Sequence, residues 1–416
     1  MRVLIVGGGG REHALAWALA RSAARPTLFV APGNAGTARV ATNLAIAADR
    51  SGELREVVRR ERIDLVVVGP EAPLVAGLAD QLRADGALVF GCSRAAAAIE
   101  GSKALCKDLA HRHGIPTAAF GTFSSLVEAS QFIDTRLRAH SRIVVKADGL
   151  AAGKGVYVCD GGIEAKRAAE DLLAYGGRIV VEEFLVGREA SLLAFVVDED
   201  VVPLDSAEDH KTIFDGDRGP MTGGMGVVSP TPVLHDAMLA RAVDEILRPS
   251  ARALVAEGRA FRGLLFAGLM ITADGPKLLE YNCRFGDPET EALVARLDDG
   301  PGGDLLVALE SVAHGRAPVP LVFGKGAAVT VVMAQAGYPG TLAPSVELRG
   351  LDSVDALVFH AGTRLDGDRT FSSGGRVLAV TGVGVDVASA RTQAYDAVAK
   401  IDFPGAQIRR DIGARA

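Results

Sequence analysis

The first hundred residues alternate short apolar runs with longer stretches of helical periodicity. A short apolar run bounded by turn residues is typical of a buried strand, whereas apolar positions spaced three and four apart indicate a helix. Apolar strands separated by helices predict a parallel sheet that is covered on both faces. The predicted strands are residues 3–6, 27–30, 64–68 and 87–90, and the predicted helices are residues 12–21, 54–60 and 74–83.

A second region, from about residue 101 to residue 316, mixes strands, helices and a hairpin. The hairpin is predicted from the runs 266–272 and 277–285, which the turn 273–276 joins. The other predicted strands are residues 143–146, 156–159, 179–184 and 190–197, and the predicted helices are residues 163–173 and 234–257.

A third region begins near residue 327, after the prolines Pro318 and Pro320. A chain of 416 residues is too long for one core, so several domains are expected. The predicted strands of this region are residues 328–334, 356–360 and 376–381, and its predicted helix is residues 387–400. We predict an α/β protein, α+β in part, with domains at residues 1–101, 102–316 and 327–416.

Composition narrows the class of protein. Hydrophobic residues make up 49% and charged residues 23%, which is ordinary for a globular protein. The net charge of −6 argues against nucleic-acid binding, so any anion site must be built locally. The four cysteines lack metal-site spacing, and the first apolar run is too short for a signal peptide. We expect a cytoplasmic protein with no membrane and no nucleic-acid partner.

Residues 280–289 carry the most informative motif. If residues 277–285 form a strand, side chains alternate between its faces, so Glu280, Asn282 and Arg284 share one face. The opposite face then presents Leu279, Tyr281, Cys283 and Phe285 to a core. A carboxylate beside an amide oxygen suits Mg²⁺, and the following turn adds two more acids. The alternative is an ordinary amphipathic edge strand.

The glycine run at residues 7–10 resembles a dinucleotide-binding turn but fails on spacing. Glu12 or His13 falls where a third small residue should stand. A glycine turn that opens a helix still presents free amides to a phosphate, and Arg11 adds a positive charge. We favour a phosphate-binding turn over a merely structural one. Loops 32–37 and 69–73 lie at the same predicted sheet edge and are candidate substrate contacts or plain turns.

Residues 146–155 form the second strong motif. Lys146 ends a predicted strand, and the glycines that follow allow a hairpin to close over phosphates. The spacing is not that of a Walker A loop, and a solvated glycine hairpin is the alternative. Lys103 is a candidate second phosphate ligand. Residues 180–185, followed by residues 187–191, resemble a hinge that contacts an adenine, although an acidic strand end is also common.

The segment 209–226 is a long polar insertion, which in a compact domain tends to be functional. Its His210 has no triad partner and is interpreted as structural. The eight histidines show no metal-ligand clustering, which argues against zinc.

Several motifs together resemble the phosphoribosylamine–glycine ligases, also called glycinamide ribonucleotide synthetases, of the ATP-grasp superfamily. The similarity spans essentially the whole chain. Its motifs are residues 9–14, 31–37, 69–74, 100–103, 146–155, 222–226, 282–290, 359–363 and 374–378.

The resemblance implies a ligase that joins glycine to 5-phosphoribosylamine at the expense of ATP, an early step of purine synthesis. It also implies an N-terminal α/β domain, an ATP-grasp domain with a mobile lid at about residues 118–186, and a small C-terminal α+β domain. Mg²⁺ or Mn²⁺ is the implied cofactor, ATP, glycine and phosphoribosylamine are the implied partners, and a monomer is expected.

The same resemblance implies residue roles. The metal ligands would be Glu280 and Asn282. The ATP contacts would be Lys103, Lys146, Gly149, Gly153, Lys154, Gly155, Glu182, Phe184, Leu185 and Glu189. Catalysis would involve Arg284, Asp209, Lys211 and Asp287, the last three of which, with Glu289, would orient glycine and the amine. The phosphoribosyl part would contact Gly10, Arg11, Glu12, Asn34, Gly36 and Glu71.

Two departures from the family pattern stand out. Met221 replaces the usual Asn before residues 222–226, so we leave it out of the predicted site, and Cys92 stands where Pro is common. Three alternatives stay open: another ATP-grasp carboxylate–amine ligase, a dehydrogenase, and a nucleotide-sensing protein without catalysis.

Overall fold

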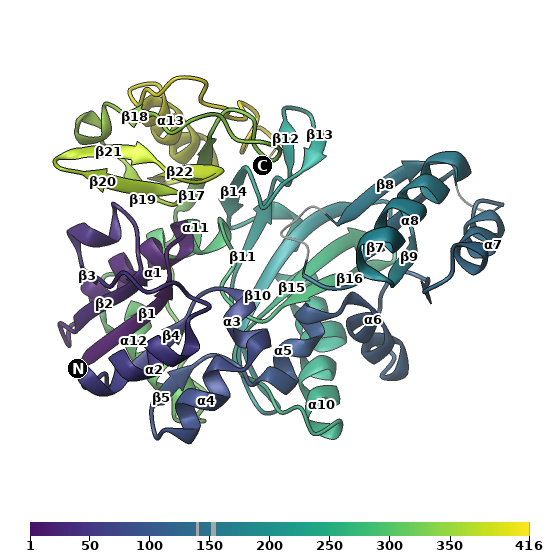
Figure 1. Ribbon diagram of the computed structural model, residues 1–416, viewed down its shortest axis with the longest axis horizontal. Helices are drawn as coiled ribbons and strands as arrows, with labels where there is room; N and C mark the ends of the chain where they lie inside the picture. Colours follow the sequence, from purple (N-terminus) through teal and green to yellow (C-terminus); the bar gives the residue numbers. More distant parts are fainter. Residues whose placement is uncertain (139–140, 151–154, 416) are drawn as a thin grey trace.

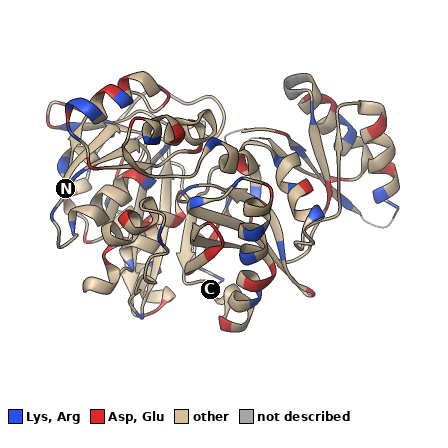
Figure 2. Cartoon of the chain, turned by 90° about the horizontal axis from the view of Figure 1, so that it is seen from below, with Lys and Arg blue, Asp and Glu red and all other residues tan. Residues whose placement is uncertain are grey.

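The computed structural model describes residues 1–138, 141–150 and 155–415 of the chain. In Figure 1 the N-terminal sheet and the lid, which carries α7 and α8, lie at opposite ends of the molecule, with a long central sheet between them. Acidic and basic residues are interspersed along the chain (Figure 2). Within the described ranges no helix has both the length and the apolar character needed to cross a bilayer.

The N-terminal region is a five-stranded sheet in the order β3-β2-β1-β4-β5, and all its strand pairs are parallel. The parallel α/β prediction is therefore confirmed. The predicted helix 74–83 is instead two helices, because Gly77 adopts φ +90° between them. The strands are β1 (Arg2–Gly7), β2 (Thr27–Pro32), β3 (Thr42–Asn43), β4 (Leu65–Val68) and β5 (Leu88–Phe90). The helices are α1 (Gly10–Ala20), α2 (Ser51–Arg60), α3 (Glu71–Ala76), α4 (Leu78–Ala84) and α5 (Arg94–Gly101), and α6 (Lys103–Arg112) follows at the start of the middle region.

The lid is a four-stranded antiparallel sheet in the order β6-β9-β7-β8. Two helices pack on it and enclose a separate hydrophobic core that includes Ile133, Ile143 and Val181. Its strands are β6 (Phe120–Phe123), β7 (Arg142–Ala147), β8 (Val156–Asp160) and β9 (Ile179–Glu183), and its helices are α7 (Leu126–Arg136) and α8 (Gly162–Gly176).

The central sheet has eight strands in the order β16-β15-β10-β11-β14-β17-β22-β19, all paired antiparallel. Strand β14 belongs to the middle region and β17 to the third, so one hydrogen-bonded sheet runs through both. Its strands are β10 (Arg188–Val197), β11 (Asp200–Asp209), β14 (Gly226–Ser229), β15 (Arg262–Thr272), β16 (Gly275–Asn282), β17 (Ala327–Ala334), β19 (Leu357–His360) and β22 (Arg376–Gly384).

Smaller elements complete the fold. A hairpin of β12 (Thr212–Phe214) and β13 (Arg218–Met221) projects beside β14. The third region adds a sheet in the order β18-β21-β20, and α13 packs on β22 and β17. The bounds are β18 (Glu347–Leu348), β20 (Thr363–Asp366), β21 (Arg369–Ser372), α11 (Glu289–Ala295), α12 (Leu305–Ala313) and α13 (Val387–Val398).

The predicted helix 234–257 is present but not continuous. It consists of α9 (Asp236–Ala242), the π-helical turn η3 (Val243–Leu247) and α10 (Arg248–Ala256). Pro249 lies in the first turn of α10. Because proline lacks an amide hydrogen and its ring crowds the preceding turn, the regular α-helical bonding cannot continue through it.

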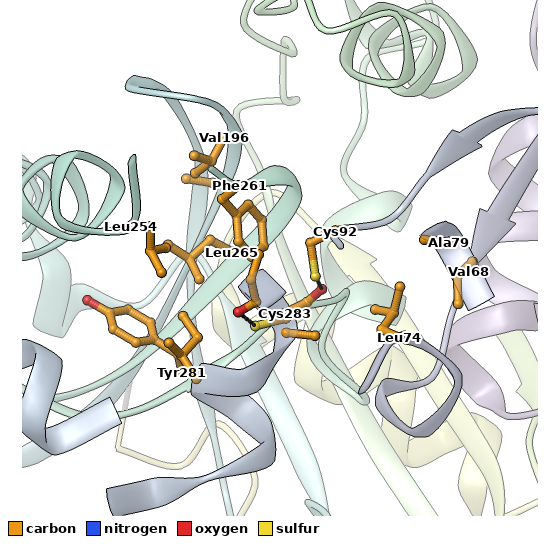
Figure 3. Close-up of a cluster of buried hydrophobic side chains, with 14 of the residues drawn as sticks. Val68, Leu74, Ala79, Cys92, Val196, Leu254, Phe261, Leu265, Tyr281 and Cys283 are labelled. Atoms are coloured by element: carbon orange, nitrogen blue, oxygen red, sulfur yellow. Dashed lines mark hydrogen bonds between the residues drawn. The ribbon is translucent and has the colours of Figure 1, made fainter. Parts of the chain in front are cut away.

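The observed strand β16 begins two residues earlier than the predicted strand 277–285 and differs from it in two further ways. It ends at Asn282, and its pairing with β15 shifts register opposite Gly268 and Leu269, which leaves Leu279 as an extra residue. Leu279 therefore lines the cavity beside Glu280 and packs on the small apolar cluster of Leu185 and Met270, apart from the core that receives Tyr281 and Cys283. After the shift Tyr281 and Cys283 do enter the core, among Leu254, Leu265 and their neighbours (Figure 3).

The N-terminal and C-terminal regions meet at two buried histidines. The backbone amide of His360 donates to Nδ1 of His13 at 2.8 Å, and the side-chain amide of Asn34 donates to the His360 carbonyl at 2.6 Å. Burial lowers the pKa of His13 to about 3 and that of His360 to about 4, with a smaller contribution from neighbouring positive charge. Both rings are therefore neutral in the folded protein near neutral pH.

This contact predicts acid sensitivity. An unfolded histidine has a pKa of about 6.5, so below that pH the unfolded chain binds protons that the folded chain excludes. The free energy of unfolding should fall as the pH drops from about 6.5 to about 4. In His13→Asn the new amide oxygen can still accept from the His360 amide. The change in the free energy of unfolding per pH unit should then be smaller by up to ~1.4 kcal/mol.

Urea unfolding at several pH values between 4.5 and 7 measures the slope. The control is His314→Asn at an exposed position at the end of α12, where the slope should equal that of the unchanged protein. Equal slopes in the unchanged protein and in His13→Asn would contradict the prediction.

Candidate active site

A cavity of about 360 Å³ opens where the N-terminal region, the lid, the central sheet and the third region meet. Most residues of the predicted site lie in its wall. These are Arg11, Glu71, Lys103, Gly149, Gly155, Asp209, Lys211, Glu280, Asn282, Arg284, Asp287 and Glu289. Met221, which the sequence led us to leave out, also lines the cavity.

Glu280 and Asn282 lie on β16 and face this cavity. Among the described residues the carboxylate of Glu280 has no hydrogen-bond or ion-pair partner. Burial opposes its ionisation, but the ammonium groups of Lys146 and Lys211 outweigh burial and lower the pKa of the carboxyl. The Oδ1 atom of Asn282 accepts from Nη2 of Arg284 at 2.9 Å.

These two residues fit a divalent cation with oxygen ligands. Glu280 supplies an ionised carboxylate that is free of protein partners in the described part of the chain, and the amide oxygen of Asn282 keeps a second lone pair. No cluster of three or more acidic, histidine or cysteine ligands occurs among the described residues. A site with few protein ligands that is completed by phosphates is typical of Mg²⁺.

Arg284 is fixed by two carboxylates in addition to Asn282. Its Nε atom lies 3.1 Å from Oε2 of Glu71, and Nη2 lies 3.2 Å from Oε1 of Glu100. The backbone amide of Cys283 donates to the other oxygen of Glu100 at 2.6 Å. Glu100, which the sequence did not identify, thus ties α5 to the end of β16 and orients the guanidinium.

The lid contacts α6 beside the cavity. Nζ of Lys103 donates to the Gly149 carbonyl at 3.0 Å. Asp148 accepts from the Ser102 hydroxyl at 2.9 Å and from the Ala104 amide at 3.1 Å, so it caps the start of α6. The predicted ATP contacts Gly153 and Lys154 lie outside the described residues.

The other predicted ATP contacts lie behind or beside the main cavity. Lys146 and Glu182 form a buried ion pair of 2.8 Å. The guanidinium of Arg142 lies over the ring of Phe184, 4.2 Å from its centre. Leu185 packs in a small apolar cluster, and Glu189 lines an adjoining cavity of about 20 Å³ that Glu280 also lines.

The predicted catalytic acids and lysine form a second cluster. Nζ of Lys211 lies 3.0 Å from Oδ2 of Asp209, and the hydroxyl of Ser191 donates to Glu289 at 2.8 Å. Burial raises the pKa of Glu289, and the negative charge of Asp209 raises it further. The pKa of Lys211 is raised: burial lowers it, but the surrounding carboxylates outweigh burial.

The N-terminal residues divide into those that line the cavity and those that shape its loops. Arg11 donates to the Phe285 carbonyl at 2.9 Å and to Glu12 at 2.6 Å. Glu12 in turn accepts from the Gly9 amide at the start of α1, and Asn34 donates to three carbonyls. The side chains of Glu12 and Asn34 hold loops together and do not line the cavity.

Gly10 and Gly36 are places of close approach. A Cβ atom would lie 2.4 Å from Glu291 at Gly10 and 2.2 Å from the ring of His13 at Gly36. At Gly36 a larger residue would displace the ring of His13, whereas at Gly10 it would displace the end of the Glu291 side chain.

The third region contributes two residues that the sequence did not assign to the site. Nη2 of Arg376 lies 3.1 Å from Oδ1 of Asp287, and Nη1 donates to the Gly223 carbonyl at 2.7 Å. The hydroxyl of Tyr338 accepts from the Gly223 amide at 3.1 Å. The motif at residues 374–378 contains Arg376, but the sequence did not show that it reaches the cavity.

Comparisons with known proteins agree with this geometry. Three family models match: the N domain of phosphoribosylglycinamide synthetase over residues 1–100, its ATP-grasp (A) domain over 101–290 and its C domain over 328–415. The phosphoribosylamine–glycine ligase of Allochromatium vinosum is 48% identical over 100% of this chain and 99% of its own length. That of Salmonella typhimurium is 45% identical over 100% of this chain and 99% of its own length.

Solved structures show the same fold. The crystal structure of phosphoribosylamine–glycine ligase from Thermotoga maritima matches with a TM-score of 0.84 and 33% identity, over 99% of this chain and 100% of that one. The biotin carboxylase domain of Hydrogenobacter thermophilus 2-oxoglutarate carboxylase, crystallised with MgADP, matches with a TM-score of 0.72 and 14% identity, over 98% of this chain and 91% of that one.

The lid sheet, the central antiparallel sheet and the cavity between them define an ATP-grasp protein. More narrowly, the chain belongs to the phosphoribosylglycinamide synthetase family. The resemblance found in the sequence is therefore confirmed, and a dehydrogenase is excluded.

Arg376→Met tests the contribution of the third region. The change leaves Asp287 without its cation and frees the loop at Gly223. We expect ATP turnover at subsaturating substrate to fall about tenfold or more, equivalent to ~1.4 kcal/mol. Arg364→Met on β20, at an exposed arginine over Phe371, should turn over normally. The prediction is wrong if the two variants have equal rates.

Proposed function

We propose that the chain joins glycine to 5-phosphoribosylamine and splits ATP to ADP and phosphate, giving glycinamide ribonucleotide for purine synthesis. Family membership and full-length relatives of this activity support the proposal. The observation that carries it is the end of β16, where an ionised carboxylate, an amide oxygen and a guanidinium face one cavity. These three groups suit the transfer of a phosphoryl group to the carboxylate of a small substrate.

The chemistry accounts for the kind of residues in the cavity. A glycine carboxylate is a poor electrophile, because an oxide ion is a very poor leaving group. Transfer of the terminal phosphoryl group of ATP to a carboxylate oxygen gives glycyl phosphate. The amine of phosphoribosylamine attacks its carbonyl carbon, and phosphate leaves. The protein then mainly positions reactants and neutralises charge, and no nucleophilic side chain is required.

ATP-grasp ligases in general use ATP together with a divalent metal ion. We assign Glu280 and Asn282 as the residues that would hold Mg²⁺, or Mn²⁺ in its place. When bound, the ion would neutralise charge on the ATP phosphates.

The remaining cavity residues have distinct proposed roles. Arg284, held by Glu71 and Glu100, offsets negative charge on the transferring phosphoryl group. Lys211 attracts the glycine carboxylate. Glu289, whose pKa burial raises, is suited to take a proton from the attacking amine.

The phosphoribosyl part belongs at the start of α1. The free amides of that helix and the guanidinium of Arg11 form an anion site in a chain of net negative charge. Glu71 lies beside Arg11 in the same wall and can accept hydrogen bonds from ribose hydroxyls.

We propose that the enzyme acts as a cytoplasmic monomer on small molecules. All four cysteines are free and buried, which suits a reducing compartment.

An ADP-release assay tests the proposed reaction. The unchanged protein should release ADP only when glycine and phosphoribosylamine are both present with ATP and Mg²⁺. Turnover with other carboxylate and amine pairs, but not with this pair, would point to a different ATP-grasp ligase. ATP binding without turnover on any pair would point to a nucleotide sensor.

Glu280→Gln tests the metal assignment. The substitution keeps the shape of the side chain but removes the anionic oxygen that we assign to the cation. We expect turnover to fall by about a hundredfold or more, ~2.7 kcal/mol or more, with the melting temperature nearly unchanged. Glu310→Gln at a half-exposed site on α12 is the control and should behave normally. Near-normal activity of Glu280→Gln at saturating Mg²⁺ would refute the assignment.

A further inference from the structure

Two buried lysines share one carboxylate behind the cavity. Oε1 of Glu182 lies 2.8 Å from Nζ of Lys146, and Oε2 lies 2.8 Å from Nζ of Lys107. The side chains of Lys107 and Glu182 are 1% and 2% exposed, so water cannot replace these contacts. Lys107 was not part of the predicted site, although it lines the cavity whereas Lys146 does not.

Lys107 lies where the lid joins the body. It belongs to α6, while Glu182 lies on lid strand β9 and Lys146 on lid strand β7. Its ammonium group also donates to the Thr117 hydroxyl at 2.8 Å and to the Leu278 carbonyl of β16 at 3.4 Å. One ammonium group therefore contacts the lid, the body and the segment that connects them.

The charges of this triad decide what the cavity offers an anion. With one carboxylate and two ammonium groups, the triad carries one net positive charge. Without Lys107, Glu182 would neutralise Lys146 completely, and the net charge of the triad would be zero. A buried carboxylate that has only one cationic partner also keeps that partner close, because an unpaired buried charge is costly.

We propose that Lys107 is a positioning residue for nucleotide binding: it holds one oxygen of Glu182 and thereby leaves Lys146 with positive charge for the ATP phosphates. The inference rests on the proposed function, since it assumes that ATP is the ligand beside Lys146. In this role Lys107 does not itself contact ATP.

Three variants test this inference in the ADP-release assay, with glycine and phosphoribosylamine saturating and ATP varied. Lys107→Met removes the ammonium group and keeps the length of the side chain. It should raise the KM for ATP about tenfold, equivalent to ~1.4 kcal/mol, and change kcat much less. The double variant Lys107→Met with Glu182→Gln restores one net positive charge on Lys146, so its KM should return to within about threefold of the unchanged protein.

The third variant is a matched control. Lys166→Met removes a lysine from the ion pair with Asp134 on the outer face of the lid and should leave the KM for ATP unchanged. A merely structural role for Lys107 predicts a lower melting temperature with an unchanged KM, and that result would overturn the inference. A double variant whose KM is no better than that of Lys107→Met would overturn it too.

The remaining outcomes are also decisive. If Lys107→Met does not fold, the double variant decides: a KM near that of the unchanged protein supports the inference, and a raised KM or failure to fold overturns it. If the unchanged protein itself shows no turnover with glycine and phosphoribosylamine, the proposed function has failed, which is a different result from a failure among the variants.

Discussion

The register shift at Leu279 is the constraint on which the site depends. Beyond it, Tyr281 and Cys283 enter the hydrophobic core, and the apolar surface that they bury stabilises this register. Since neighbours on a strand point to opposite faces, Glu280 and Asn282 must then face the cavity. The apolar side chains therefore position the polar ones. A slip of one residue would bury the Glu280 carboxylate among apolar groups, at a cost no local contact could offset.

The positive charges of the cavity are held in place by acids and carbonyls. Arg284 contacts Glu71 and Glu100, Lys211 contacts Asp209, and Arg376 contacts Asp287. A desolvated cation without such a partner would be costly, so each pair allows the charge to persist before an anion arrives. This explains how a chain with a net charge of −6 can build a site for phosphates.

The sequence predicted local structure better than long-range structure. Apolar runs located β1 and β4, and the motif at residues 280–289 identified Glu280 and Asn282, because these signals lie within a few adjacent residues. Three features were not predictable in this way: the register shift at Leu279, the contact of Lys107 with Glu182, and the place of Arg376 in the cavity. Each depends on pairing between segments far apart in the chain, which periodicity and spacing do not encode.

The continuous sheet gives the third region a direct part in the site. Strand β14 pairs with β17, and β17 pairs with β22, whose first residue is Arg376. The loop that contains Gly223 precedes β14 and also accepts a hydrogen bond from Arg376. Its position is thus fixed by β14, which pairs with β17 of the third region, and by the guanidinium of Arg376. The same guanidinium also contacts Asp287, so the third region supplies part of the cavity wall. The third region therefore takes part in shaping the cavity, through Arg376 and Tyr338.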